Sequence, residues 1–238
     1  MRQIITLGGG GFSMEPENLA LDRYILSQCA TNRPNVCFVP TASGDSERYV
    51  ANFQRAFNTL SCVPTTLNLF PMPPTRDLEG FVRSQDVIYV GGGSTRNLIA
   101  LWKEWHLDEI IKKAYQSGVI LAGISAGMNC WFEQYLTDSI SPDLDPMSGL
   151  GLLGGSACPH YRGETMRKPR FRELIESGDL KAGVAADDSC GIHWIDEQIS
   201  AVVASKLDAQ AYACGMNQGA FVESVLPARL LDPENRTV

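Results

Sequence analysis

The segment that most constrains this chain is Gly123-Ile124-Ser125-Ala126-Gly127. It fits the pattern G-x-S-x-G, in which a serine occupies a sharp turn from a strand to a helix and projects its hydroxyl away from the sheet. An apolar run at residues 118–122 precedes it, and residues 126–132 can form a helix. The alternative is an ordinary glycine-rich turn, but the position directly after an apolar strand favours a nucleophile elbow centred on Ser125.

Apolar, β-branched runs alternate with helical stretches through the first half of the chain. The expected strands are residues 4–7, 36–39, 65–69, 87–90 and 118–122, and the expected helices are residues 16–30, 46–60, 96–102 and 107–117. This alternation predicts a mostly parallel sheet covered by helices. After about residue 180, short strands joined by turns suggest an antiparallel edge on that sheet. Because no linker or internal repeat divides the chain, we expect a single domain over residues 1–238.

Composition excludes several classes of function. The net charge of −7 argues against a nucleic-acid partner, which would need a basic surface. No apolar run has the length of a membrane span, and glycine interrupts the first residues too soon for a signal peptide, so we expect a cytoplasmic protein without a membrane partner. The seven cysteines are irregularly spaced and the histidines number only three, which predicts reduced core thiols and no metal site.

Three glycine-marked turns follow expected strands, at residues 8–11, 91–93 and the elbow itself. In open α/β sheets, ligands bind beyond the carboxyl ends of the strands, so these turns are expected to line one crevice. A phosphate-binding loop is the weaker interpretation, because neither of the first two turns leads into Gly-Lys-Ser/Thr.

A serine hydroxyl needs a base to become nucleophilic, and the base needs an orienting acid. His160 is favoured because it follows the expected strand end Ser156-Ala157-Cys158-Pro159, where it can reach the same crevice as the elbow. His193 lies inside an outer strand and is the second choice, whereas His106 lies in a helix connection and is expected to be structural or at the surface.

The acid is sought between Ser125 and His160. Asp138 is favoured because it falls in a returning segment after the elbow helix, and Glu133, near the end of that helix, is the second choice. Asp143 and Asp145 occupy a proline-containing loop and are expected to be solvated.

An oxyanion hole requires backbone N–H donors aimed at the developing negative charge. The N–H of Ala126, directly after the serine, is the first expected donor. The second is expected from the Gly91-Gly92-Gly93 turn, with Gly92 preferred and Gly93 as the alternative.

Taken together, these segments resemble the peptidase E family of serine peptidases, which includes aspartyl dipeptidases and cyanophycinases. The resemblance covers most of the chain and rests on five segments in order: the opening strand with its glycine run, Val39-Pro40-Thr41-Ala42-Ser43, residues 89–95, the elbow, and Pro159-His160-Tyr161. It implies a three-layer α/β/α sandwich with a mostly parallel sheet, similar to class I glutamine amidotransferase domains. It also implies Ser125 as nucleophile, His160 as base, an oxyanion hole at Gly92 and Ala126, and no cofactor. The family's acid follows the elbow helix and varies between Asp and Glu, which fits Asp138 or Glu133.

The same resemblance implies a short peptide as substrate. Aspartyl dipeptidases of this family hold the substrate's aspartyl carboxylate with an arginine downstream of the histidine. Here Arg167 and Arg170 are the candidates, although Met166 occupies the position that aligns directly. The expected function is a cytosolic serine peptidase acting on dipeptides or short peptides, including Asp-X. The alternatives are cyanophycinase-like hydrolysis of a β-aspartyl-arginine polymer and a non-catalytic binding protein on the same scaffold. Trp102 and Trp105 suit the core or an interface, so a homo-oligomer is one expectation.

Overall fold

The computed structural model describes residues 1–141 and 143–232. Within them, an eight-stranded sheet has the order β14-β11-β10-β1-β5-β4-β2-β3. Its strands are β1 (Gln3–Leu7), β2 (Asn35–Val39), β3 (Val63–Thr66), β4 (Val87–Val90), β5 (Ile120–Ile124), β10 (Cys190–Ile195), β11 (Gln198–Ala204) and β14 (Arg229–Leu230). The pairs from β1 to β3 are parallel, whereas β10 joins β1 antiparallel. The expected parallel core is therefore present, but only β10 and β11 of the short strands expected after residue 180 lie on its antiparallel side. The expected strands at residues 184–186 and 211–214 belong to another sheet, which corrects the prediction of a single edge.

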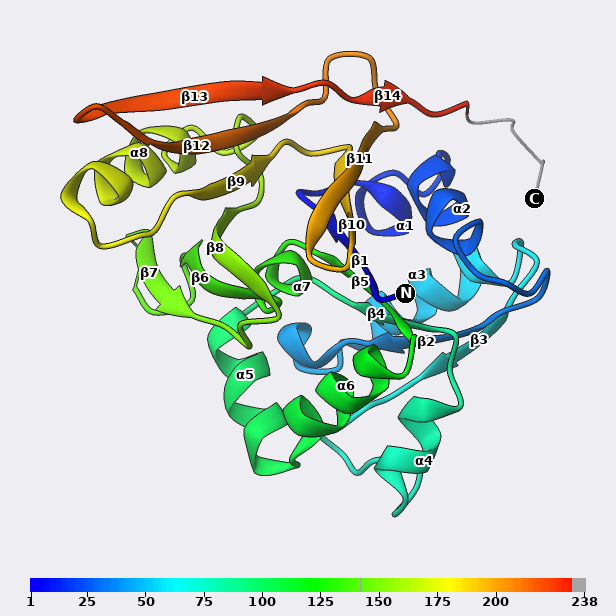
Figure 1. Cartoon of the computed structure of the whole chain (residues 1–238). Coiled ribbons are helices and arrows are strands. Elements are labelled where there is room, and N and C mark those ends of the chain that lie inside the picture. The colour runs from blue at the N-terminus through cyan, green and yellow to red at the C-terminus, as the bar shows by residue number, and fades with distance from the viewer. Residues whose placement is uncertain (142, 233–238) are drawn as a thin grey trace.

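Helices cover both faces of this sheet, giving three layers (Figure 1). One layer contains α1 (Gly11–Met14), α2 (Ala20–Leu26) and α3 (Glu47–Phe57), and the other contains α4 (Leu78–Arg83), α5 (Thr95–Glu104) and α6 (Leu107–Gln116). Side chains of neighbouring strand residues point to opposite faces. Accordingly Ile4 joins the cluster packed against α4–α6, whereas Ile5 joins the one packed against α2 and α3. Strands buried on both faces explain the continuous apolar runs in the sequence.

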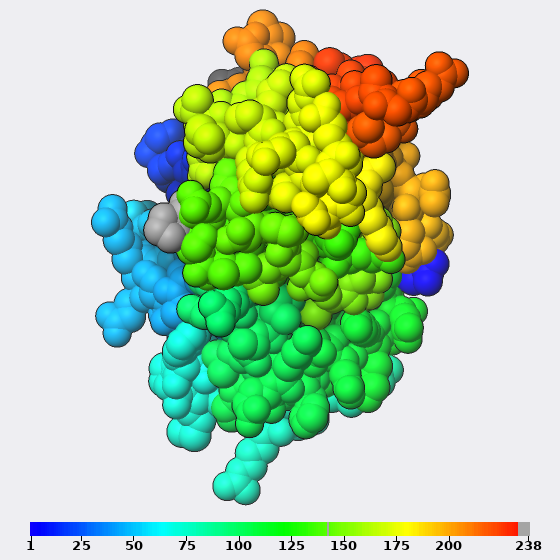
Figure 2. Space-filling model, turned by 90° about the vertical axis from the view of Figure 1, so that its left-hand side faces the viewer, coloured from blue at the N-terminus to red at the C-terminus, as the bar shows by residue number. Residues whose placement is uncertain are grey.

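A second sheet, which the sequence did not predict, has the strand order β13-β12-β9-β8-β6-β7. Its strands are β6 (Phe132–Thr137), β7 (Asp145–Ser148), β8 (Leu153–Cys158), β9 (Gly183–Ala186), β12 (Ala211–Asn217) and β13 (Ala220–Leu226). Helix α8 (Arg167–Ser177) lies beside β12 and β13. In Figure 2, α8 and its neighbours (green to yellow) form the upper part of the face shown, and the helices of the first sheet (green) form the lower part.

The two sheets meet where the functional segments lie. The backbone N–H of His160, after β8, donates to the Gly8 carbonyl after β1 at 3.2 Å. That of Ser189, after β9, donates to the Gly9 carbonyl at 3.0 Å. The carboxyl ends of β1, β8 and β9 are thus joined at one place.

All seven cysteines are unpaired, and six of them are buried, as expected for core thiols. Across residues 1–141 and 143–232, no helix combines the length and apolar character needed to cross a bilayer.

Candidate active site

Ser125 stands between β5 and the short helix α7 (Ala126–Asn129) with φ of 57°, a conformation that is rare for residues other than glycine. Its N–H donates to the Leu7 carbonyl at 3.0 Å, which ties the elbow to β1. A Cβ at Gly127 would overlap the carbonyl oxygen of Val90, and one at Gly123 would overlap that of Gly127. The two glycines of the motif therefore allow α7 to pack directly on β4 and β5, with the serine at the turn.

His160 is brought to this serine by the second sheet. Its Nε2 lies 2.9 Å from Ser125 Oγ. Besides the bond from its own N–H to Gly8, the next N–H, of Tyr161, donates to the Ala186 carbonyl at 3.1 Å. The imidazole is thus held between the ends of β1 and β9, within hydrogen-bond reach of the hydroxyl that a base must deprotonate.

The acid beside His160 is Asp188, which corrects the sequence prediction. Asp188 Oδ1 lies 2.5 Å from His160 Nδ1. Because the carboxylate only accepts hydrogen bonds, Nδ1 carries the proton and Nε2 is free to accept one from Ser125. The aspartate follows β9, which runs parallel to β8 with Cys158 opposite Ala185. The loops that carry Asp188 and His160 therefore follow the carboxyl ends of two neighbouring parallel strands, at the same edge of the sheet.

The two predicted acids are engaged elsewhere. Asp138 Oδ1 is 4.0 Å from Arg167 Nη2 and its side chain is 62% exposed. Glu133 Oε2 accepts hydrogen bonds from Lys181 Nζ at 2.8 Å and from the Gly155 N–H at 3.0 Å. These bonds, the one from Lys181 first, lower the pKa of Glu133 below its ordinary value. Both acids lie on or just after β6, on the far side of β8 from β9, which is why neither meets His160.

The Asp188 carboxylate lies so close to two glycines that neither position has room for a side chain. A Cβ at Gly9 would overlap its Oδ1, and one at Gly163 would overlap its Oδ2. The preceding residue, Asp187, fixes the loop: its carboxylate accepts bonds from the Arg162 N–H at 3.1 Å and from Arg162 Nε at 2.8 Å. Arg162 thereby connects the segment after His160 to the segment that carries Asp188.

The two expected oxyanion donors, the N–H groups of Gly92 and Ala126, differ in whether they already donate a hydrogen bond. A Cβ built on Gly92 would stand 3.2 Å from Ser125 Cβ and 3.6 Å from its Oγ, so the glycine turn does lie against the serine. However, the Gly92 N–H donates to Tyr49 Oη at 3.2 Å. Across the described residues, the N–H groups of Gly93 and Ala126 donate no hydrogen bond. Ala126 directly follows Ser125, and Gly93 directly follows the glycine that lies against Ser125.

A histidine bonded to the elbow serine and to a carboxylate is the arrangement that serine hydrolases use. The model of peptidase family S51 matches residues 4–202. The chain belongs to this family. The Bacillus subtilis (strain 168) peptidase YgaJ is 52% identical over 97% of this chain and 100% of its own length. A peptidase E of Streptomyces coelicolor is 28% identical over 61% of this chain and 62% of its own.

Among solved structures, a peptidase from an acI-B1 actinobacterium has a TM-score of 0.67 at 18% identity, covering 96% of this chain and 95% of that one. At this identity the likeness concerns the fold. The family assignment confirms the resemblance inferred from the sequence and makes this chain a serine-type peptidase.

The two arginines considered as substrate ligands in this S51 peptidase are bonded within the protein. Arg167 is only 4% exposed; its Nε lies 2.5 Å from Glu164 Oε2, and its Nη1 donates to the Leu136 carbonyl at 3.4 Å. Arg170 Nη1 lies 2.9 Å from Glu173 Oε2, and its Nε donates to the Leu144 carbonyl at 3.0 Å. Both guanidinium groups therefore already have a carboxylate partner within the protein.

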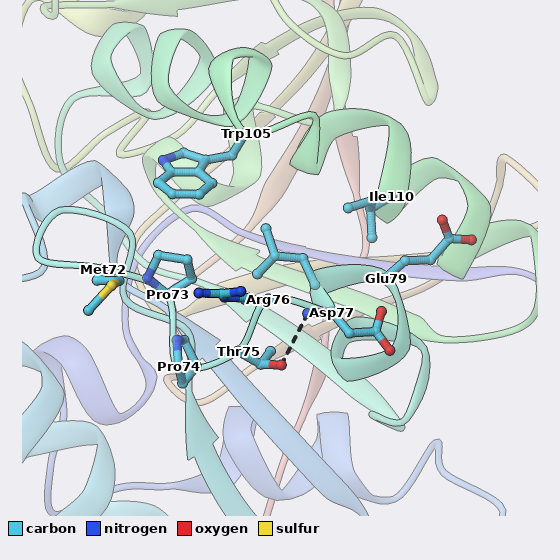
Figure 3. Close-up of a pocket in the computed structure, with 10 residues that line it drawn as sticks. Met72, Pro73, Pro74, Thr75, Arg76, Asp77, Glu79, Trp105 and Ile110 are labelled. Atoms are coloured by element: carbon cyan, nitrogen blue, oxygen red, sulfur yellow. Dashed lines mark hydrogen bonds between the residues drawn. The ribbon is translucent and has the colours of Figure 1, made fainter.

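An apolar groove of about 760 Å³ lies elsewhere on the S51 fold. Figure 3 shows Trp105 and Ile110 across from the segment at residues 72–77, which precedes α4. None of its lining residues belongs to the segments that carry Ser125, His160 or Asp188. The groove is therefore separate from the candidate active site.

Proposed function

We propose that this chain is a serine peptidase that hydrolyses dipeptides or short peptides through Ser125, His160 and Asp188. The observation that carries the proposal is the continuous hydrogen-bonded chain from Ser125 Oγ to His160 Nε2, at 2.9 Å, and from His160 Nδ1 to Asp188, at 2.5 Å. In such a chain the carboxylate fixes the tautomer of the imidazole and stabilises the imidazolium that forms during attack.

Catalysis proceeds in two halves. His160 Nε2 takes the proton of Ser125 as Oγ attacks the scissile carbonyl, and it returns that proton to the leaving amine, which leaves an acyl-enzyme. Water then attacks the acyl-enzyme with His160 again as the base. The tetrahedral oxyanion is held by the Ala126 N–H and by a donor from the Gly91–Gly93 turn, where the Gly93 N–H is the unengaged one. This sequence of steps requires no cofactor.

The arginines support a broader preference than Asp-X. A guanidinium recognises a carboxylate by paired hydrogen bonds in a fixed geometry, so an arginine already bonded within the protein must first break those bonds. Since Arg167 and Arg170 both have carboxylate partners within 2.9 Å, we propose that hydrolysis does not depend on an aspartyl residue in the substrate.

The test is hydrolysis of a dipeptide panel by wild type and by Ser125→Ala. The panel contains Asp-Leu, other X-Leu dipeptides and β-Asp-Arg. We expect several X-Leu members to be cleaved by wild type and none by the variant. Cleavage of Asp-Leu alone would restore aspartyl specificity, and cleavage of β-Asp-Arg alone would favour the cyanophycinase-like reaction. Hydrolysis by Ser125→Ala at the wild-type rate would contradict the serine mechanism.

A further inference from the structure

The turn at Gly91–Gly93 is held by three backbone N–H groups. The Gly91 N–H donates to the Val39 carbonyl at 3.1 Å, and the Ser94 N–H donates to the Ala42 carbonyl at 2.8 Å. The third, from Gly92, goes to the hydroxyl of Tyr49 at 3.2 Å. Of these three acceptors, only Tyr49 Oη belongs to a side chain, so it is the one that a substitution can remove without altering the backbone.

Tyr49 and Ser125 both pack closely against this turn. A Cβ at Gly91 would lie 2.9 Å from Tyr49 Cε1, so the tyrosine ring rests directly on the turn. A Cβ at Gly92, one residue later, would lie 3.2 Å from Ser125 Cβ. Tyr49 therefore anchors the peptide between Gly91 and Gly92, and Gly92 is the residue that lies against Ser125.

The tyrosine ring is itself fixed by aromatic neighbours. It stands on α3, with ring centroids 5.0 Å from Phe38 and 5.5 Å from Phe12. Burial raises the pKa of Tyr49 above its ordinary value, so the side chain is a neutral phenol at physiological pH and its oxygen can accept the Gly92 N–H. A ring held by aromatic neighbours and a hydroxyl that accepts the Gly92 N–H suit an anchor.

We propose that Tyr49 is a positioning residue for catalysis at Ser125, an inference that rests on the function proposed above. Its hydroxyl holds the Gly92 peptide, and this keeps the turn at the distance and angle from which the Gly93 N–H, with that of Ala126, meets the oxyanion. The Gly92 N–H then acts as the anchor point of the turn. A shift of the turn misaligns the donor where charge develops, and this slows the chemical step more than it weakens substrate binding.

In the alternative arrangement, the Gly92 N–H is itself the oxyanion donor, and Tyr49 competes with the oxyanion for that N–H. Removing the hydroxyl would then release the donor and accelerate the reaction. The direction of the rate change in Tyr49→Phe therefore separates the two arrangements.

The experiment follows labelling of the full-length chain by a fluorophosphonate, a probe that needs no knowledge of the natural substrate. In this step Ser125 Oγ forms a bond to phosphorus, the P–F bond breaks, fluoride leaves, and the serine proton passes to His160. We would measure the maximal labelling rate constant and the half-saturating probe concentration for wild type, Ser125→Ala and Tyr49→Phe. Tyr24→Phe is the matched control, because it removes a half-buried tyrosine hydroxyl that bonds His193 Nδ1 at 2.8 Å.

We expect Tyr49→Phe to lower the maximal rate constant about tenfold, less than the loss of an oxyanion donor itself, with little change in half-saturation. Tyr24→Phe should label like wild type. Because the ring remains, thermal melting should show Tyr49→Phe to be folded. Labelling of Tyr49→Phe at the wild-type rate or faster, while wild type labels at Ser125, would overturn the role of Tyr49 alone. Failure of wild type to label at Ser125 would overturn the proposed function together with the inference.

Discussion

At the scale of single residues, the position of the candidate acid depends on two glycines that are far apart in sequence. Gly9 follows β1 and Gly163 follows His160, and a Cβ at either would overlap a carboxylate oxygen of Asp188. Neither glycine has a positive φ, so the reason for glycine there is space and not backbone conformation. The position of Asp188 in the triad therefore depends on the absence of a side chain at Gly9 and Gly163.

Gly163→Ala tests this dependence. The added methyl group displaces the Asp188 carboxylate from His160, and misplacing the orienting carboxylate of such a triad costs about 100-fold or more in rate. We expect that loss in the labelling rate constant, with the protein still folded. Gly154→Ala is the control, because a Cβ at Gly154 meets open space. Equal rates in the two variants would contradict the close fit around Asp188.

At the scale of elements, Arg167 connects α8 to β6. Its buried guanidinium donates one hydrogen bond to Glu164, just before α8, and another to the Leu136 carbonyl of β6. These bonds indicate a structural role, whereas the sequence suggested a substrate-binding one. The distinction can be measured, since loss of a structural contact lowers stability whatever the substrate.

We predict that Arg167→Met lowers the free energy of unfolding by about 2 kcal/mol, the usual value for hydrogen bonds made by a charged group. The relative rates on Asp-Leu and on other X-Leu dipeptides should stay the same. Denaturant unfolding and the dipeptide panel provide the two measurements. The matched control is Arg172→Met on the same helix, whose exposed pair with Glu176 is worth about 0.5 kcal/mol or less. A selective loss of Asp-Leu hydrolysis in Arg167→Met would restore the substrate role.

Prediction from sequence succeeded where one element carries the signal and failed where two elements must be placed together. The elbow at Ser125 and the strand end before His160 are local features, and the structure sets those two side chains 2.9 Å apart. The acid was sought only between these residues, whereas Asp188 follows them and reaches His160 through the β8–β9 pairing. The available signal was the apolar run Val184-Ala185-Ala186 ending in Asp187-Asp188, the same strand-end pattern that indicated His160.

At the scale of the whole molecule, the division of the strands into two sheets could not be predicted, because it depends on pairing between distant segments. Strands β9 and β10 are separated by only a few residues, yet β9 joins the second sheet and β10 the first. The short strands after residue 180 were expected, but nothing in their pattern assigns each to a sheet. The organisation of residues 1–238 as one domain stays a prediction.

The core of the first sheet contains a carboxyl group that makes the stability of the molecule depend on pH. Asp22 is fully buried; burial raises its pKa from 3.8 to about 7, against the opposing effect of the hydrogen bond from the Phe12 N–H. Between those two values the folded chain binds more protons at Asp22 than the unfolded chain. The free energy of unfolding therefore falls as pH rises through this window, by up to about 1.4 kcal/mol per pH unit.

Asp22→Asn should remove that slope. The buried His193 acts in the opposite direction, because burial lowers its pKa below 6.5 and acidification therefore costs stability. Since His193 is present in both proteins, its effect cancels in the difference between the variant and wild type. We expect the variant to gain stability relative to wild type as pH rises from about 5 to 7, measured by denaturant unfolding. A difference that does not change with pH would contradict an elevated pKa at Asp22.

The most direct test of the proposed triad compares fluorophosphonate labelling of Asp188→Asn with that of Asp138→Asn and Glu133→Gln. The three substitutions make the same chemical change at the observed acid and at the two acids that the sequence suggested. We predict that Asp188→Asn lowers the labelling rate constant by about 10³-fold to 10⁴-fold, because the imidazole loses the partner that fixes its tautomer. The other two should stay within about twofold of wild type, since neither touches His160. A wild-type rate in Asp188→Asn, or a comparable loss in Asp138→Asn or Glu133→Gln, would contradict the triad of Ser125, His160 and Asp188.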